Sequence, residues 1–249
     1  MATAWVLGSM GWMPARGQQT CCVLTEIGNE LILLDAGTGV ANLAWCSDVL
    51  RRHDHVSVLL SHYHLDHVAG LMYLKRFVAN KRVDVYGPGK PVYKKATETY
   101  LSEVLQQVVY GSGHKGFARE VCYHDYGGQD FAVGNVRVGV RGQHHSAPSF
   151  ELRLDDALVY ATDTNFDAAA WREVAPAQLL LHECWQINDD DPRHTSADAL
   201  VAGLPSDAFD RILLIHQNPA WSKKQLLTLK DKIAKREFEL ARDGMVLEL

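Results

Sequence analysis

Short apolar runs that are typical of strands alternate along the chain with longer runs that are typical of helices. The strand-like runs are Ala4–Leu7, Thr20–Glu26, Leu31–Leu34, Val56–Leu60, Arg82–Tyr86, Glu120–Tyr123, Asn135–Val140, Phe150–Leu154, Ala157–Ala161, Leu179–Leu181, Ile212–Ile215 and Met245–Leu249. The helix-like runs, judged from apolar residues at helical spacing, are about 40–52, Gly70–Ala79, about 92–110, Asp167–Val174, Thr195–Leu204 and Lys223–Lys235.

This order of elements differs from the regular strand–helix alternation of a Rossmann fold, because hairpin-like strand pairs interrupt the helices in both halves. Two mixed β-sheets packed face to face, with helices outside, would satisfy the pattern. We therefore expect an α/β protein with a four-layer αββα sandwich. No repeat, long linker or charge block divides the 249 residues, so we expect one domain over residues 1–249.

Composition and charge narrow the class of protein. With 47% hydrophobic and 22% charged residues, the chain can form a large packed core and is not a disordered protein. No uncharged apolar run approaches the roughly 18 residues that a membrane-spanning helix needs, so we expect no membrane partner. The net charge of -5 argues against binding nucleic acid through charge alone.

The N-terminus and the cysteines indicate the compartment. The first 15 residues carry no charged side chain, but no positive segment precedes them and Gly8, Gly11 and Pro14 interrupt them, so a strand and a glycine-rich loop are favoured over a signal peptide. Five cysteines without a CxxC pair indicate neither a disulfide framework nor a zinc ribbon. We expect a cytoplasmic protein.

The strongest chemical signal among the 12 histidines is the run from Ser61 to His67, Ser-His-Tyr-His-Leu-Asp-His, directly after a strand-like run. In an extended segment, residues two apart point the same way, so His62 and His64 can share one metal ion. The chain then turns into a helix, and Asp66 and His67 can hold a second ion. A chance match to four specified residues within six positions has a probability on the order of 10⁻³ in a chain of this size.

These residues resemble the HxHxDH loop of the metallo-β-lactamase superfamily, and the opening segments Val6–Ser9 and Leu33–Gly37 are similar to its first strands. In the ribonuclease Z-like branch of that superfamily, further ligands follow downstream. His145 is similar to the third ligand histidine, Asp163 resembles the bridging aspartate, and His216 matches the final ligand.

The resemblance implies a centre with two divalent metal ions, Zn²⁺ in the first place and Mn²⁺ or Fe as alternatives. The first ion would be held by His62, His64 and His145. The second would be held by Asp66, His67 and His216, and Asp163 would bridge the two. Two ions, two carboxylates and a bridging hydroxide leave about one positive charge, which favours an anionic substrate. That hydroxide would be the nucleophile, oriented by a hydrogen bond to Asp66.

His194 is a candidate general acid. It resembles the histidine that protonates the leaving alkoxide in ribonuclease Z-like and carbon–phosphorus-lyase-associated phosphodiesterases. An alkoxide is a strong base, and imidazole is a suitable acid near neutral pH. The alternative is a solvent-exposed residue at the start of a helix that Thr195 caps.

Spacing favours a compact substrate. His145 and Asp163 are 18 residues apart, which leaves no room for the tRNA-binding arm that the best-known bacterial ribonuclease Z inserts there. We therefore expect a phosphodiesterase that acts on a small or nucleotide-sized diester. The alternatives are a tRNA 3′-end endoribonuclease, a lactone, thioester or lactam hydrolase, and a metal-binding sensor module without enzyme activity. Because relatives are often dimers, a homodimer is an expectation from the resemblance alone.

Other residues are weaker candidates. His182 and Glu183 resemble a His-Glu pair of tRNA-processing relatives that could hydrogen-bond a ligand, or they simply end a strand. Trp12 and Trp221 could line the pocket. Residues 110–116 form a lid that binds phosphate, or a helix end and a linker. Four other histidines are expected to be ordinary: His144 points away from the metals, and His53, His55 and His124 are solvated. Two features depart from the family pattern: Glu151 replaces a common glycine, and only the adjacent Cys21-Cys22 are present where the carbon–phosphorus-lyase-associated relative has a cysteine-rich zinc site.

Overall fold

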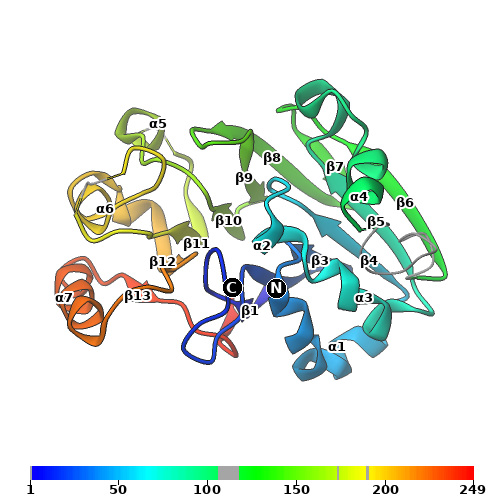
Figure 1. Cartoon of the computed structure of the whole chain (residues 1–249), viewed down its shortest axis with the longest axis horizontal. Coiled ribbons are helices and arrows are strands. Elements are labelled where there is room, and N and C mark those ends of the chain that lie inside the picture. Colours follow the sequence, from blue (N-terminus) through cyan, green and yellow to red (C-terminus); the bar gives the residue numbers. More distant parts are fainter. Residues whose placement is uncertain (1, 106–117, 173, 189–190) are drawn as a thin grey trace.

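The computed structural model describes residues 2–105, 118–172, 174–188 and 191–249. In this part of the chain, two seven-stranded β-sheets pack face to face, and helices cover both outer faces (Figure 1). The expected four-layer αββα arrangement is confirmed. The segment 110–116, considered above as a lid, lies outside the described residues.

The first sheet has the order β14-β1-β2-β3-β4-β5-β6 and the second the order β13-β12-β11-β10-β9-β8-β7. The strands are β1 (Ala2–Gly8), β2 (Cys22–Ile27), β3 (Glu30–Leu34), β4 (His55–Leu59), β5 (Arg82–Gly87), β6 (Glu120–Asp125), β7 (Phe131–Val133), β8 (Val136–Gln143), β9 (Ser149–Leu154), β10 (Leu158–Ala161), β11 (Ala177–Glu183), β12 (Phe209–Ile215), β13 (Glu239–Leu240) and β14 (Val246–Glu248). Both sheets are mixed, because β3 to β6 and β10 to β13 pair in parallel while the other neighbours pair antiparallel.

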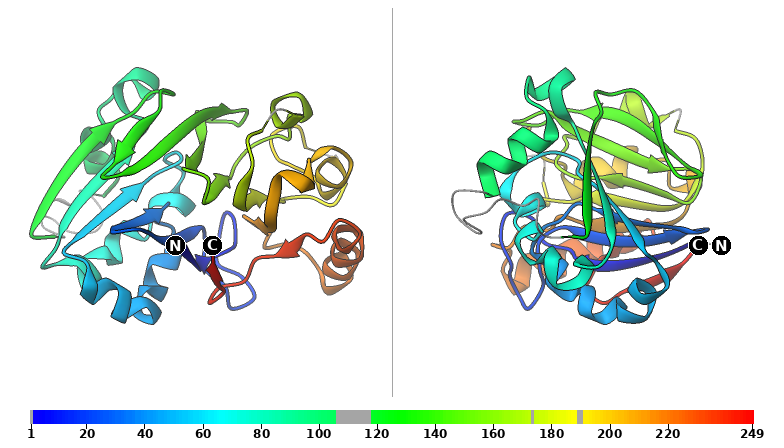
Figure 2. Two further views of the ribbon diagram at one scale, coloured as in Figure 1. Left: turned by 180° about the vertical axis from the view of Figure 1, so that it is seen from behind. Right: turned by 90° about the vertical axis from the view of Figure 1, so that its right-hand side faces the viewer.

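The helices lie on opposite flanks of the sheet pair. They are α1 (Ser47–Arg52), α2 (Leu65–Val68), α3 (Leu71–Val78), α4 (Thr97–Leu105), α5 (Ala168–Arg172), α6 (Ala197–Gly203) and α7 (Lys223–Ala234), with the 3₁₀-helices η1 (Thr38–Cys46) and η5 (Ser206–Ala208) and the π-turn η2 (Gly89–Tyr93). Figure 2 shows α5, α6 and α7 on the side away from α1, α3 and α4. Within the described residues, no helix is long and apolar enough to cross a membrane.

The near-continuous apolar strands follow from this layering. In β3, Ile32 and Leu34 pack between the two sheets, whereas Leu31 and Leu33 pack under the helices of the first flank. In β11 the inner and outer residues alternate in the same way, so both faces of these strands are buried and no polar face appears in the sequence. The inner core joins residues of both sheets. On this basis we propose that the chain folds as one domain.

Several element boundaries differ from the sequence prediction. The expected helix over 92–110 is replaced by η2 and, from Thr97, by α4. Thr195 does not cap α6: the hydroxyl of Ser196 accepts the hydrogen bond from the amide of Ala199 at 3.0 Å, while Thr195 is buried and donates to the carbonyl of Thr164. The sequence prediction also missed β7 and β13, which are too short to show a period, whereas the helix expected after the histidines begins at Leu65, as α2.

The residues of the candidate site lie together at one edge of the sheet pair. The loop that carries the histidine run follows β4, Asp163 follows β10, and His216 follows β12. Because β10, β11 and β12 run parallel, their carboxyl ends meet at one edge, which is where side chains from distant segments converge.

Candidate metal centre

The histidine run is held in place by a buried aspartate that sequence reasoning did not single out as a site residue. Asp35, fully buried after β3, accepts hydrogen bonds from the amide and hydroxyl of Ser61 at 2.7 and 2.8 Å and from the hydroxyl of Tyr160 at 2.9 Å. The Nδ1 atom of His67 lies 2.6 Å from the same carboxylate. Asp35 therefore orients His67 so that its Nε2 atom faces the site.

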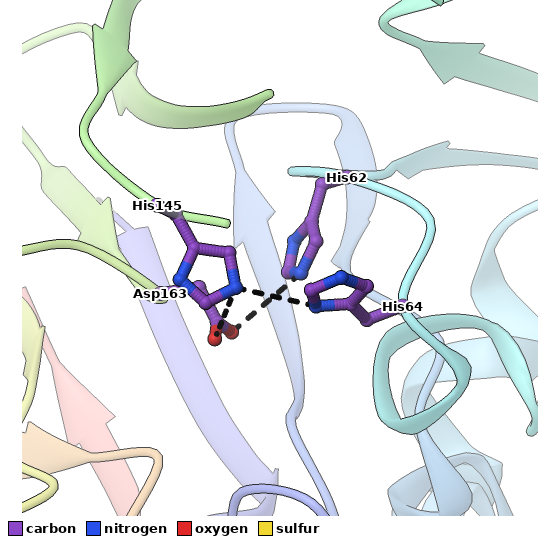
Figure 3. A group of neighbouring side chains, drawn as sticks. All are labelled: His62, His64, His145 and Asp163. Atoms are coloured by element: carbon purple, nitrogen blue, oxygen red, sulfur yellow. Dashed lines mark hydrogen bonds and ion pairs between the residues drawn. The ribbon is translucent and has the colours of Figure 1, made fainter. Parts of the chain in front are cut away.

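His62, His64, His145 and Asp163 form the first ligand group (Figure 3), with ligand atoms that all lie within 4.8 Å of one another. They come from the loop after β4, the loop between β8 and β9, and the end of β10. The Nε2 atom of His145 lies 3.3 Å from His64 Nδ1 and 3.2 Å from Asp163 Oδ1, and His62 Nε2 lies 3.7 Å from Asp163 Oδ2.

The second ligand group consists of Asp66, His67 and His216, again around Asp163. The Nε2 atoms of His67 and His216 lie 2.7 and 3.1 Å from Asp163 Oδ2. The same two atoms lie 3.4 and 3.3 Å from Asp66 Oδ2. The structure thus brings all seven proposed ligands together, and the Asp163 carboxylate lies between the two groups.

The side chains fit two divalent cations. His62 Nε2, His67 Nε2 and Asp163 Oδ2 are buried and have no hydrogen-bond partner among the described residues, although carboxylate and imidazole atoms lie close to them. Buried polar atoms normally have a partner, and metal ions would supply one for each of these atoms. Imidazole with carboxylate is a ligand set that Zn²⁺, Mn²⁺ and Fe accept.

The electrostatics of the two groups differ. Burial, reinforced by the neighbouring His67, lowers the pKa of His62 well below its usual value despite the nearby Asp163. Burial would also lower the pKa of His67, but Asp66, Asp35 and Asp163 together outweigh it and raise that pKa well above the usual value. Burial opposes the charge on Asp163, yet the surrounding imidazoles hold the pKa of this carboxyl far below its usual range. Asp163 is therefore an anion, as the expected bridging role requires.

Backbone strain is concentrated here. Asp35, Asp163 and His216 have φ angles of 52°, 49° and 52°, the left-handed region that side chains other than glycine rarely adopt and that costs about 1–3 kcal/mol per residue. A Cβ atom on Gly11 would lie 2.5 Å from the ring of His216. Only glycine therefore allows the loop between β1 and β2 to pack against this imidazole.

His194 lies beside the metal groups and is paired with Glu183. Its Nδ1 atom is 3.0 Å from Glu183 Oε2 and 4.0 Å from Asp163 Oδ1, and its side chain is only 14% exposed. Glu183 is fully buried and accepts hydrogen bonds from the amides of Thr164 and Thr195. Burial disfavours the charged carboxylate, but His194 and His216 lower the pKa of Glu183. His194 is thus not the exposed residue of the alternative reading.

Four imidazoles and two carboxylates of this region face a small cavity of about 190 Å³. Its lining residues are Trp12, His64, Asp66, His145, Ser146, Asp163, Trp185, His194 and His216. Trp12 was expected to line the pocket and does. Trp221 is buried and lines a separate cavity against α7.

The remaining weaker candidates make structural contacts and do not line this cavity. His182 is buried, its Nδ1 atom lies 2.8 Å from the carbonyl of Glu183, and its ring packs on Trp171. His144 is exposed and lies outside this cavity. The remaining positions also have local partners: Glu151 pairs with Arg141, His53 with Glu26, and His55 and His124 with Asp84. All five cysteines are unpaired.

Comparisons with known proteins agree with this geometry. A family model described as "Anti-Pycsar protein Apyc1" matches residues 6–239. The chain is 26% identical to the probable metallo-hydrolase YhfI of Bacillus subtilis over 254 residues, which cover 98% of each chain. The crystal structure of YhfI, described as a metallo-β-lactamase fold protein, matches with a TM-score of 0.76 over the full length of both chains.

Two further similarities bear on the branch. Ribonuclease Z of Methanopyrus kandleri is 31% identical over 153 residues, 60% of this chain; the match spans about half, 48%, of that relative. A diphosphatase from the PhnP family matches with a TM-score of 0.77 and 17% identity over 100% of this chain and 98% of the other. The expected metallo-β-lactamase fold and the resemblance to its ribonuclease Z-like branch are therefore confirmed.

Proposed function

Because this chain belongs to the anti-Pycsar protein Apyc1 family, we propose that it is a dinuclear metal-dependent phosphodiesterase acting on a small or nucleotide-sized diester. The observation that carries the proposal is the His194–Glu183 pair beside the two ligand groups. An alkyl phosphodiester expels an alkoxide, a strong base that a neighbouring imidazole can protonate.

The metal ions would be held by the two ligand groups described above, with Asp163 shared. When bound, they supply a hydroxide at neutral pH and positive charge near the phosphate oxygens. Asp66 takes part in orienting the nucleophile: its Oδ2 atom faces His67 and His216 and is fixed from behind by the amide of Trp12 at 2.7 Å.

Glu183 determines which proton His194 can donate. With Nδ1 directed at the Glu183 carboxylate at 3.0 Å, the other ring nitrogen of His194 is the one available to the substrate. In the proposed reaction His194 gives its Nε2 proton to the leaving oxygen, and Glu183 is a positioning residue for it.

The proposed size of the substrate rests on the cavity and on the chain between the ligands. A volume of about 190 Å³ suits a phosphate and its nearest neighbours. The segment between His145 and Asp163 forms only β9, β10 and their turns, so this position carries no RNA-binding arm. The similarity to ribonuclease Z keeps a tRNA 3′-end endoribonuclease as the second candidate.

A panel of substrates on the metal-analysed protein tests the proposal. We expect hydrolysis of 3′,5′-cyclic nucleotides, little cleavage of a precursor tRNA, and none of a lactone, thioester or lactam. Hydrolysis of the carboxyl substrates alone would contradict the proposed reaction, and preferential cleavage of precursor tRNA would select the second candidate. Two bound metals with no hydrolysis of any substrate would favour a sensor module.

We further propose Zn²⁺ as the resident metal and the cytoplasm as the compartment. The histidine-rich ligand set supports the first proposal. The unpaired cysteines support the second.

A further inference from the structure

Cys21 is a buried thiol beside the second ligand group, and neither the expected ligand set nor the proposed reaction uses it. Its Sγ atom and one ring nitrogen of each of His67 and His216 all lie within 4.8 Å of one another. Among the groups of potential metal ligands in the described residues, this is the only one that contains a cysteine. The structure therefore places a sulphur atom next to two imidazoles that are expected to hold a metal ion.

The backbone of Cys21 is fixed relative to the segments that carry the ligands. The residue lies directly before β2, where its amide donates to the carbonyl of Met10 at 3.0 Å and its carbonyl accepts from the amide of Gly37 at 2.9 Å. The hydroxyl of the preceding Thr20 donates to the carbonyl of Asp66 at 2.8 Å. These contacts connect Cys21 to the turn after β3 and to the histidine run, so its thiol is held beside the centre.

The two neighbouring cysteines face opposite sides of the first sheet. Cys21 belongs to the inner core between the sheets, whereas Cys22 belongs to the core under the helices of the first flank, as successive residues of an extended segment do. Both are fully buried. A buried free cysteine packs as a small apolar side chain, and that role accounts for Cys22. Cys21 alone of the pair also has imidazole nitrogens near its sulphur atom in the described part of the chain.

The neighbouring His67 has a ring nitrogen that is available to a metal ion. Its Nδ1 atom contacts Asp35 at 2.6 Å, which leaves Nε2 for the site. This Nε2 atom is buried and has no hydrogen-bond partner among the described residues. Since buried polar atoms normally have a partner, the unpaired nitrogen points to an ion at the place where Cys21 also contributes a potential ligand.

Cys21 approaches the second ligand group from the protein interior. It does not line the cavity that Asp66 and His216 help to form. Its side chain belongs instead to the inner core, together with apolar residues such as Leu34 and Ile215. A sulphur ligand from this side would therefore leave the cavity to the substrate.

We propose that Cys21 is a further ligand of the second metal ion. A lone pair of its Sγ atom forms the bond to the metal, and the thiol proton passes to water. Thiolate is a soft ligand that suits Zn²⁺ better than Mn²⁺. The first ligand group contains no cysteine, so the second site is the one that selects Zn²⁺. This inference rests on the candidate metal centre and not on the proposed phosphodiesterase reaction.

Cobalt-loaded protein tests the sulphur ligand directly. Because Zn²⁺ has a filled d shell and is spectroscopically silent, the metal-free chain is loaded with Co²⁺ and its absorption is recorded without substrate. We expect a thiolate-to-cobalt charge-transfer band in the near ultraviolet. Cys21→Ser should remove this band, and the matched control Cys22→Ala should keep it. A wild-type protein that binds two Co²⁺ ions without the band, or a band that survives in Cys21→Ser, would overturn the proposal.

Competition with a chelator gives a second readout. Cys21→Ser should weaken the binding of one Zn²⁺ ion by about tenfold or more and change the binding of Mn²⁺ much less, whereas Cys22→Ala should alter neither. Equal changes for the two metals would contradict ligation by sulphur, and no uptake of any ion would contradict the metal centre itself. Neither measurement needs a substrate. A protein with the cobalt band but without phosphodiesterase activity would therefore defeat the proposed function and support this inference.

Discussion

The two ligand groups use the same residue types. They differ in the residues that contact their imidazoles on the side away from the candidate metal sites. In the first group, the imidazoles contact neutral atoms: His62 Nδ1 lies 3.0 Å from the hydroxyl of Ser61, and His145 Nδ1 lies 3.4 Å from the carbonyl of Arg193. In the second group, carboxylates lie near the ring nitrogens that point away from the candidate metal site. Asp35 contacts His67 at 2.6 Å, and Glu183 lies 3.4 Å from His216 Nδ1.

The pKa values of the two groups shift in opposite directions. Burial is the largest cause that lowers the pKa of His62, His64 and His145. Burial acts in the same direction on His67 and His216, but nearby anions outweigh it and raise both pKa values well above the usual one: Asp66, Asp35 and Asp163 for His67, and Asp163, Cys21 and Asp66 for His216. An anionic partner behind an imidazole also makes it a stronger metal ligand. We infer that anionic partners hold the rings of the second group in place and that neutral partners hold those of the first.

The largest effect is expected at the residue that both groups share. Asp163→Asn removes the bridging anion, so bound metal should fall from two ions per chain to one or fewer, and phosphodiesterase activity should fall by about 10³-fold or more. Metal analysis by mass spectrometry and initial rates check both. Asp156→Asn, at a carboxylate with 94% side-chain exposure, is the control. Two retained ions would contradict the bridging role.

Substituting the proposed acid should slow the chemical step without affecting metal binding. His194→Ala should keep both metals and lose about 10²- to 10⁴-fold in kcat on a cyclic nucleotide. On bis(p-nitrophenyl) phosphate the loss should be far smaller, because a nitrophenolate leaves without protonation. The exposed neighbour variant His144→Ala should match wild type on both substrates. Equal losses on the alkyl and aryl diesters would show that His194 does not act as the acid.

The difference between the groups can be tested by substituting the residues that contact the ligand imidazoles on the side away from the candidate metal sites. Asp35→Asn should weaken binding of one of the two ions by about 10- to 100-fold, because it replaces the anion that supports His67. Ser61→Ala removes a neutral partner of His62 and one of the hydrogen bonds to Asp35, but it leaves the Asp35 anion and the hydrogen bond from the Ser61 amide in place, so it should weaken binding less. Competition with a chelator measures both affinities. If the two variants weaken binding equally, the distinction between charged and neutral support is wrong.

The smallest effect is expected at a residue that contacts Asp35 and not a candidate metal ligand. Tyr160→Phe removes the hydroxyl that donates to Asp35 at 2.9 Å but leaves the hydrogen bonds from Ser61. The free energy of unfolding should decrease by about 1 kcal/mol, with metal stoichiometry unchanged. Chemical denaturation with a metal assay checks this. A loss of the second ion would mean that the tyrosine also fixes the position of the Asp35 carboxylate.

Much of the fold was predictable because local patterns coincide with the layers. Strands such as β3 and β11 are buried on both faces, so their apolar runs stand out in the sequence. The three-residue strand β7 and the two-residue strand β13 were not predictable, since neither is long enough to show a period and each depends on its neighbours. The cap of α6 depends on which hydroxyl reaches the amide of Ala199, which adjacent Thr195 and Ser196 leave open.

By itself, the sequence determined which functional groups are available. These are a run of histidines and an aspartate after a buried strand, with further candidate ligands at the ends of later strands. Only the tertiary structure decided how these groups work together. Asp35, Glu183 and Trp12 act through contacts with residues distant in the chain, such as Tyr160 and Asp66. Such contacts exist only once the two sheets are packed, because a carboxylate supports an imidazole only at hydrogen-bond distance and away from water.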